Sequence, residues 1–169
     1  MANPAEDGRP FWSHDGRWLY FSSNRSGQNE IWRMPVEGGE PTQLTKEGGF
    51  YGALSHDDQW LYYSSAIFGD IRRIGSDGSR QSVPVGQNPS FLSLATSAKG
   101  LWFISFPRPG DKEVVARLLL ASDNVTVDVA RLDFLPTPVG MAVSPDEKSL
   151  LVTRPDVSGS DLFMVNDFR

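Results

Sequence analysis

One short motif occurs twice in the first half of the chain and constrains its fold more than any other feature. It reads Ser-His-Asp, then Gly or Asp, then an apolar and aromatic run, at 13–23 and again at 55–65. Asp at this place accepts backbone N–H bonds two residues on, and Gly tolerates the positive φ of a tight hairpin turn. The aromatic run has a high strand propensity. The motif therefore predicts a repeated β-hairpin.

The spacing of the repeats predicts the architecture. Two weaker copies of the hairpin follow at 95–105 and 144–153. Leu19, Leu61, Leu101 and Leu150 hold matching places in the second strand and are spaced by 42, 40 and 49 residues. A period of about 40–50 residues with four strands per repeat is typical of a β-propeller. We therefore predict an all-β chain of about four four-stranded antiparallel blades, the last one incomplete because its outer strand is missing.

The same turns give the expected boundaries. Residues 1–8 are polar and show no periodicity, which predicts a disordered tail, and the propeller occupies 9–169. The blades are expected at approximately 9–45, 48–86, 90–132 and 138–169. The run Val114–Ala121 is compatible with a helix on composition alone, but its place between two strand pairs favours a strand.

Charge and composition exclude several classes of function. The net charge of −5 comes from 16 basic and 21 acidic residues, which argues against a nucleic-acid partner because such binding needs a basic face. The absence of cysteine excludes disulfides, thiolate metal ligands and cysteine nucleophiles. No apolar run approaches the ~18 residues of a membrane span, so we expect no membrane insertion by this segment. The first residues contain no signal-peptide core, which leaves the compartment open.

The Ser-His-Asp string suggests a catalytic triad, but the structural interpretation is stronger. Triad residues converge from distant parts of a sequence, whereas neighbours on one turn do not. The string recurs at the equivalent turn, as a fold motif does, and no G-x-S-x-G motif occurs. The two histidines lack metal-ligand spacing, and the Asp-rich turns lack a calcium loop. We predict no enzyme, no catalytic residue, no metal site and no cofactor, with calcium in a central channel left open.

The corners between second and third strands carry the candidate binding residues. In a propeller these corners gather on one face around the axis, where arginines beside aromatic side chains suit a carboxylate or a peptide. The alternative is that Arg25 stacks on an aromatic ring or caps its own loop. The five tryptophans are interpreted as blade packing rather than a ligand cage. The predicted ligand site comprises Asn24, Arg25, Tyr51, Phe68, Arg108 and Arg154.

Several linked motifs resemble the TolB-like (WD-repeat-like) propeller repeats over nearly the whole chain, from Arg9 to Arg169. The first repeat carries the residues of this pattern: Ser13-His14-Asp15-Gly16, Ser23-Asn24-Arg25-Ser26-Gly27, Ile31-Trp32, Gly38-Gly39 and Leu44-Thr45. The second and third repeats depart from it, with Asp58 in place of the turn Gly and Ser97-Ala98 in place of Asp-Gly. The resemblance implies the C-terminal propeller of a larger bacterial sensor or regulator, and a periplasmic location.

The function expected from these features is recognition. The chain is predicted to be a non-catalytic scaffold that binds a protein, peptide or small ligand on its axial face. The alternative is the accessory propeller of a prolyl-oligopeptidase-type hydrolase. Four repeats use up the chain, and an open ring exposes blade faces and strand edges. We therefore expect self-association that completes the ring, for example two four-bladed halves in one eight-bladed propeller.

Overall fold

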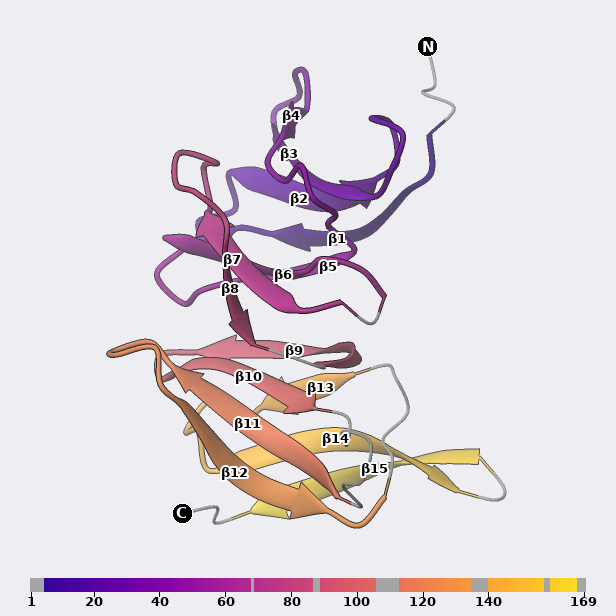
Figure 1. Cartoon of the computed structure of the whole chain (residues 1–169), viewed down its shortest axis with the longest axis vertical. Coiled ribbons are helices and arrows are strands. Elements are labelled where there is room, and N and C mark those ends of the chain that lie inside the picture. The colour runs from indigo at the N-terminus through magenta and orange to yellow at the C-terminus, as the bar shows by residue number, and fades with distance from the viewer. Residues whose placement is uncertain are drawn as a thin grey trace. The chain divides into compact units, whose positions relative to one another are not determined.

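Every regular element of the described residues is a β-strand (Figure 1). The structure is a computed structural model, and it describes residues 5–67, 69–86, 89–105, 113–134, 140–156 and 159–166. The strands form four antiparallel sheets, which we call blades 1 to 4. They fall into two compact units, Met1–Val85 with blades 1 and 2 and Gly86–Arg169 with blades 3 and 4. No helix long and apolar enough to cross a membrane occurs in the described ranges.

The first unit contains two four-stranded blades, each with its strands in sequence order. Turns that contain Gly, Asn or Asp join several of the strands, as at Asp15-Gly16, Asn24 and Asp77-Gly78. Blade 1 consists of β1 (Asp7–Trp12), β2 (Trp18–Ser23), β3 (Glu30–Pro35) and β4 (Thr42–Gln43). Blade 2 consists of β5 (Tyr51–Leu54), β6 (Trp60–Ser64), β7 (Ile71–Gly75) and β8 (Val83–Gly86).

The second unit contains one four-stranded and one three-stranded blade. The run Val114–Ala121 is a strand as far as Leu120, as predicted, because β11 pairs with β10 and β12 along its length. The last blade has three strands among the residues described, as the missing outer strand predicted. Blade 3 consists of β9 (Pro89–Ser97), β10 (Gly100–Ser105), β11 (Val114–Leu120) and β12 (Thr126–Leu132); blade 4 of β13 (Met141–Val143), β14 (Ser149–Asp156) and β15 (Gly159–Asn166).

Two details differ from the sequence-based expectations. Strand β1 begins at Asp7, so regular structure starts inside the segment predicted as a tail, because Asp7 and Gly8 pair with Ser23 and Ser22. The tryptophans also differ in how far they are buried. Trp102 is 1% exposed, as blade packing requires, whereas Trp12 is 58% exposed.

Each unit has its own hydrophobic core between its two blades. In the first unit, Tyr20 and Ile31 of blade 1 meet Leu61, Tyr63 and Ile74 of blade 2. In the second unit, Trp102, Ile104 and Leu118 of blade 3 meet Leu150 and Val152 of blade 4. Side chains alternate between the two faces of a strand, so each core uses one face of each blade.

The hairpin turns owe their geometry to a serine hydroxyl and an aspartate. Ser13 Oγ donates to Asp15 at 2.6 Å and accepts from the Trp18 N–H at 2.9 Å. The serines of blades 2 and 4 make the same bonds: Ser55 Oγ with Asp57 and Trp60, and Ser144 Oγ with Asp146 and Ser149. The Ser-His-Asp string is therefore a turn motif, in which the histidine takes no part in the serine–aspartate bond.

The link between blades 1 and 2 passes through a crowded place at Gly48 and Gly49. A Cβ on Gly49 would lie 2.6 Å from both the Ile31 nitrogen and Thr45 Oγ1. Thr45 Oγ1 itself accepts from the Ile31 N–H at 2.8 Å and donates to Glu30 at 2.6 Å. Glu30 is 1% exposed and also accepts from Gln28 and from the Gly48 N–H. This network fixes the path of the chain from one blade to the next.

We expect Gly49→Ala to lower the free energy of unfolding by about 2 kcal/mol or more, because the new methyl group overlaps backbone and cannot be relieved by a rotamer change. Urea denaturation followed by tryptophan fluorescence measures the effect. Gly8→Ala is the matched control: nothing lies within 4 Å of its added Cβ, so its cost should stay near 0.5 kcal/mol. Equal effects of the two substitutions would contradict the steric explanation.

We also expect stability to fall on acidification below about pH 4. The hydrogen bond from Ser55 lowers the pKa of Asp57 below its ordinary value of 3.8, and the bonds from Ser13 and Ser144 lower the pKa values of Asp15 and Asp146 likewise. Carboxylates with lowered pKa values stabilise the fold above their unfolded pKa, and this contribution is lost as pH falls through the folded pKa.

Ser55→Ala separates this contribution from general acid denaturation. The substitution should return the pKa of Asp57 toward 3.8 and flatten the dependence of unfolding free energy on pH between about 2 and 4. Carboxyl titration by NMR and urea denaturation across that range measure both effects. An unchanged Asp57 titration in the variant would contradict the assignment.

Candidate functional site

The predicted corner residues of blade 1 are engaged in contacts within the blade. The Arg25 guanidinium donates two bonds to Asp7, at 2.9 and 3.0 Å, and one to Ser23 Oγ at 2.9 Å. It also lies 5.0 Å from the ring centres of Phe21 and Trp32. Stacking on an aromatic ring and bonding within its own corner are the contacts that the alternative interpretation of Arg25 predicted. Partial burial opposes them, but bonds from Ser23 and Arg25 hold the pKa of Asp7 below its ordinary value.

The other predicted site residues lie apart in the sequence and in different elements. Asn24 shares the corner with Arg25, and its side-chain oxygen accepts from the Glu6 N–H at 2.9 Å. Tyr51 begins β5, where burial raises the pKa of its hydroxyl. Arg154 belongs to the second unit and lies 5.4 Å from the Phe134 ring. Phe68 and Arg108 lie outside the described residues, so convergence of the six on one face stays a prediction.

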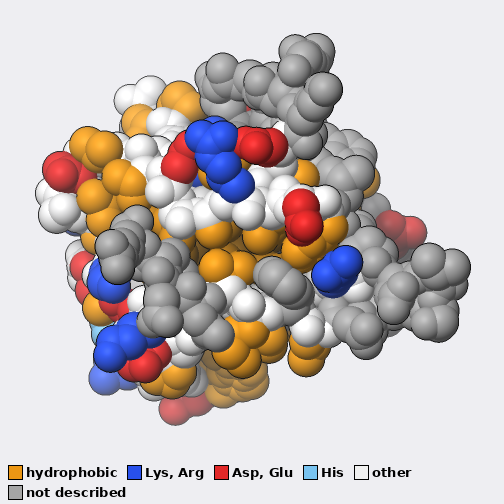
Figure 2. All heavy atoms as spheres, turned by 90° about the horizontal axis from the view of Figure 1, so that it is seen from below, with side chains coloured by type: hydrophobic (Ala, Val, Ile, Leu, Met, Phe, Trp, Pro, Cys, Tyr) orange, Lys and Arg blue, Asp and Glu red, His pale blue; other side chains and the backbone are white. Residues whose placement is uncertain are grey.

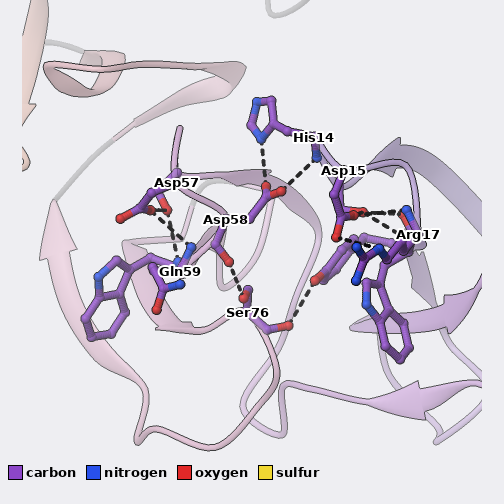
Figure 3. A network of polar contacts seen from close by, with 12 residues as sticks. His14, Asp15, Arg17, Asp57, Asp58, Gln59 and Ser76 are labelled. Atoms are coloured by element: carbon purple, nitrogen blue, oxygen red, sulfur yellow. Dashed lines mark hydrogen bonds and ion pairs between the residues drawn. The ribbon is translucent and has the colours of Figure 1, made fainter.

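The equivalent turns of blades 1 and 2 are joined by a bridge that the sequence did not predict (Figure 3). Asp58 accepts from the His14 backbone N–H at 2.9 Å, and His14 Nδ1 lies 2.6 Å from its other oxygen. The Asp58 carbonyl in turn accepts from the Ser76 hydroxyl. Asp58 has a φ of 55° at the turn position that Gly16 fills in blade 1 with a φ of 70°. Glycine would be less strained at this turn position, but only a residue with a side chain can make the inter-blade contact.

Blade 4 repeats this arrangement. Glu147 holds the same turn position with a φ of 56°. Its carboxylate accepts from the Lys99 N–H at 3.2 Å and lies 3.5 Å from Lys99 Nζ, on the turn of blade 3. An acidic residue in a left-handed turn thus joins the later blade to the earlier one in both units. Among the residues that the structure describes, no three His, Asp or Glu side chains gather as a metal site.

A cavity of about 380 Å³ lies in the first unit between the segment that follows β4 and the outer strands of blade 2. Its floor is apolar, formed by Leu44, Tyr63 and Ile74, which also belong to the core of the unit. An apolar floor of this kind favours a ligand with a hydrophobic body. The full lining is Leu44, Thr45, Lys46, Glu47, Tyr63, Arg72, Ile74, Gly78, Arg80, Gln81 and Ser82.

The rim of this cavity is cationic although the chain is acidic. Lys46, Arg72 and Arg80 outweigh Glu47 to give a net charge of +2, against −5 for the whole chain. Arg72 is oriented by Ser82, which accepts from its Nε at 2.9 Å, and by Glu47 at 3.3 Å. Ser82 Oγ also lies 2.6 Å from the Tyr63 hydroxyl. One guanidinium and two hydroxyl groups are therefore held in place at one side of the cavity.

Arg80, unlike Arg72, lies against an aromatic ring. Its guanidinium lies 4.3 Å from the Trp60 ring centre, as does that of Arg73. This cation–π contact holds the planar group of Arg80 against the Trp60 ring. Sequence reasoning missed this cavity because its lining comes from 44–47, from Tyr63 and from residues within 72–82, which only the packing of two blades brings together. The cations flanking the Asp77-Gly78 turn were the signal that could have been noticed.

Comparisons with known proteins agree with this architecture. No model of a known protein family matches the sequence. A stretch of 36 residues is 50% identical to an uncharacterized protein of Agrobacterium fabrum, covering 21% of this chain and 12% of that protein. The crystal structure of TolB from Acinetobacter baumannii superposes on 99% of the chain with a TM-score of 0.71 at 14% identity. A TolB-like protein of Agrobacterium tumefaciens superposes on 98% with a TM-score of 0.62 at 21% identity.

These likenesses define the class of fold, which is the β-propeller. Within that class, the sheets of this chain have the TolB-like form that the sequence motifs predicted. A prolyl endopeptidase also superposes on 96% of the chain, with a TM-score of 0.64 at 16% identity. The chain spans 42% of the Acinetobacter TolB, 59% of the Agrobacterium protein and 26% of the endopeptidase. Both TolB and an enzyme therefore share this fold.

We expect the Asp58 bridge to contribute about 1 kcal/mol to stability, because it contains a hydrogen bond from the backbone and a partly exposed contact with the His14 ring. Asp58→Ala removes both contacts and keeps the left-handed backbone, so it should cost more than Asp58→Gly, which removes the contacts and the strain together. Urea denaturation of the two variants, with Asp57→Asn as the turn control, measures the order. A larger loss for Asp58→Gly would contradict the assignment of strain to this position.

Proposed function

We propose that this chain is a non-catalytic recognition module that binds a carboxylate ligand with a hydrophobic body in the cavity between blades 1 and 2. The observation that carries the proposal is the combination of an apolar floor with three cations on the rim of an otherwise acidic chain. Charge-assisted hydrogen bonds from guanidinium groups to carboxylates are among the strong polar contacts in proteins. An acidic peptide or its C-terminal residue has this chemistry.

The volume and the order of the cavity support a small ligand. About 380 Å³ lies at the lower end of the roughly 300–1,000 Å³ typical of ligand pockets. Arg72 is already oriented by Ser82 and Glu47, and Arg80 by Trp60, so little side-chain ordering remains to be done on binding. The corner residues predicted from the sequence are a weaker candidate, because Arg25 already binds Asp7 and Ser23.

A matched pair of probes tests the proposal. Isothermal titration calorimetry with 3-phenylpropanoate and with its amide compares a carboxylate and a neutral group on the same apolar body. We expect the carboxylate to bind roughly ten-fold more tightly, with an affinity that falls as salt rises because the rim is exposed. Equal affinities for the two probes would contradict the proposal.

Substitutions locate the site. Arg80→Gln and Lys46→Gln should each weaken carboxylate binding about five- to ten-fold, and the amide should be insensitive to both. Arg17→Gln is the charge control, because Arg17 is 80% exposed on the turn after Asp15 and does not line the cavity. Retained affinity in the Arg80→Gln, Lys46→Gln double variant would place the ligand elsewhere.

The likeness to a prolyl endopeptidase supports a second candidate, an accessory propeller of a prolyl-oligopeptidase-type hydrolase. Such a propeller would act beside a catalytic domain that supplies the serine nucleophile. The genomic reading frame that contains this chain tests the candidate directly. An adjoining hydrolase domain with a G-x-S-x-G motif would favour it, and an adjoining DNA-binding or kinase domain would favour the recognition module.

A further inference from the structure

The blades of each unit pack through two faces that are defined by strand alternation. The face of blade 1 that contains Tyr20 and the face of blade 2 that contains Leu61 form one core. The Trp102 face of blade 3 and the Leu150 face of blade 4 form the other. We call the face that a blade turns toward the next blade in sequence its front face and the opposite one its back face. In both units, therefore, a front face packs on a back face.

The back face of blade 1 is apolar and partly uncovered. Trp12, Leu19 and Met34 form one row across β1, β2 and β3, because Trp12 pairs with Leu19 and Leu19 with Met34. Phe21 and Trp32 form the next row on the same face. Trp12 is 58% exposed, which is unusual for the largest apolar side chain. This face has the composition of a blade interface.

The front face of blade 4 is also apolar and uncovered. Ala142, Leu151 and Met164 form a row across β13, β14 and β15. Leu162 is 68% exposed and Met164 55% exposed, whereas Val165, the residue after Met164, packs into the core of the unit. Figure 2 views the side on which β12 and β15 lie in Figure 1 and shows hydrophobic side chains gathered at the surface between charged ones. Clustered exposed apolar side chains of this kind mark interaction sites.

We propose that the front face of blade 4 packs on the back face of blade 1 of a second copy of this chain. Within each unit, a front face already packs on a back face. The proposed contact forms the same kind of interface, but between two copies of the chain. Such an interface is heterologous, and two of them close a ring of two copies. The contact removes Trp12, Leu162 and Met164 from water.

The mass of the chain in solution is the first test. Light scattering coupled to size-exclusion chromatography should give twice the 18.7 kDa of one chain. Trp12→Lys and Met164→Lys should each give the monomer mass, because a buried unpaired charge is costly in an apolar interface. Val125→Lys is the control: Val125 is 50% exposed but belongs to neither face, and the variant should keep the dimer mass. A monomeric wild-type chain would overturn the proposal. The two faces would then either contact each other within one chain or bind a different protein.

Mixing the variants distinguishes this interface from other dimers. In an equimolar mixture of Trp12→Lys and Met164→Lys, one of the two interfaces contains only native residues, so the dimer mass should return. A symmetric contact that contains both Trp12 and Met164 would carry a substituted residue on each side in that mixture and would stay dissociated. Pairing of two β15 edges would already leave the Trp12→Lys variant a dimer, because Trp12 lies on β1. Failure of the mixture to dimerise would therefore overturn the proposal. Far-ultraviolet circular dichroism of each variant establishes that the strands are retained.

Engineered disulfides give an independent readout, because the chain contains no cysteine. Met34→Cys and Met164→Cys place one thiol on each face. Oxidation should crosslink the mixture of the two variants several-fold faster than either variant alone, as judged by non-reducing electrophoresis. Crosslinking of Met164→Cys with itself at the same rate as the mixture would overturn the head-to-tail arrangement.

Discussion

The structure depends on the burial of blade faces against one another. A sheet of three or four short strands with apolar residues on both faces cannot keep both faces dry by itself. Tyr63 at 1% exposure and Leu61 at 0% are buried because blade 1 lies over them. The strands, turns and bridges are arranged so that this burial can occur. The same constraint explains why the exposed apolar side chains Trp12, Leu162 and Met164 carry the proposed contact between copies.

Much of the fold could be predicted because its local signals are strong. Ser13 and Asp15 specify their turn through bonds between residues two to five apart, so the hairpin is encoded within one short stretch. The composition of Val114–Leu120 fits either a helix or a strand. Its place between two strand pairs of the repeat correctly predicted a strand. The start of β1 at Asp7 was missed because its pairing partner, Ser23, is distant in sequence and its own residues are polar.

The candidate site was less predictable for a different physical reason. Arg25 was identified by its position at a corner, but its role is decided by Asp7, which reaches it from another strand. The cavity joins Lys46 to Arg80 across two blades, and no local pattern encodes that proximity. Asp58 was interpreted as a departure from the repeat, whereas in the structure its carboxylate bonds to the turn of the preceding blade. A residue that breaks a repeat pattern can thus be one that connects the repeats.

The bridges of Asp58 and Glu147 also bear on how such a chain can change in length. Each bridge joins the second blade of a unit to the first, and the first blade carries glycine at the equivalent or neighbouring turn position. Duplication or loss of both blades of one unit leaves each bridge with both of its ends. Loss of the first blade of a unit alone removes the partner of the acidic turn and leaves a left-handed, charged residue without compensation. The two blades of one unit therefore form the segment that keeps its own bridge.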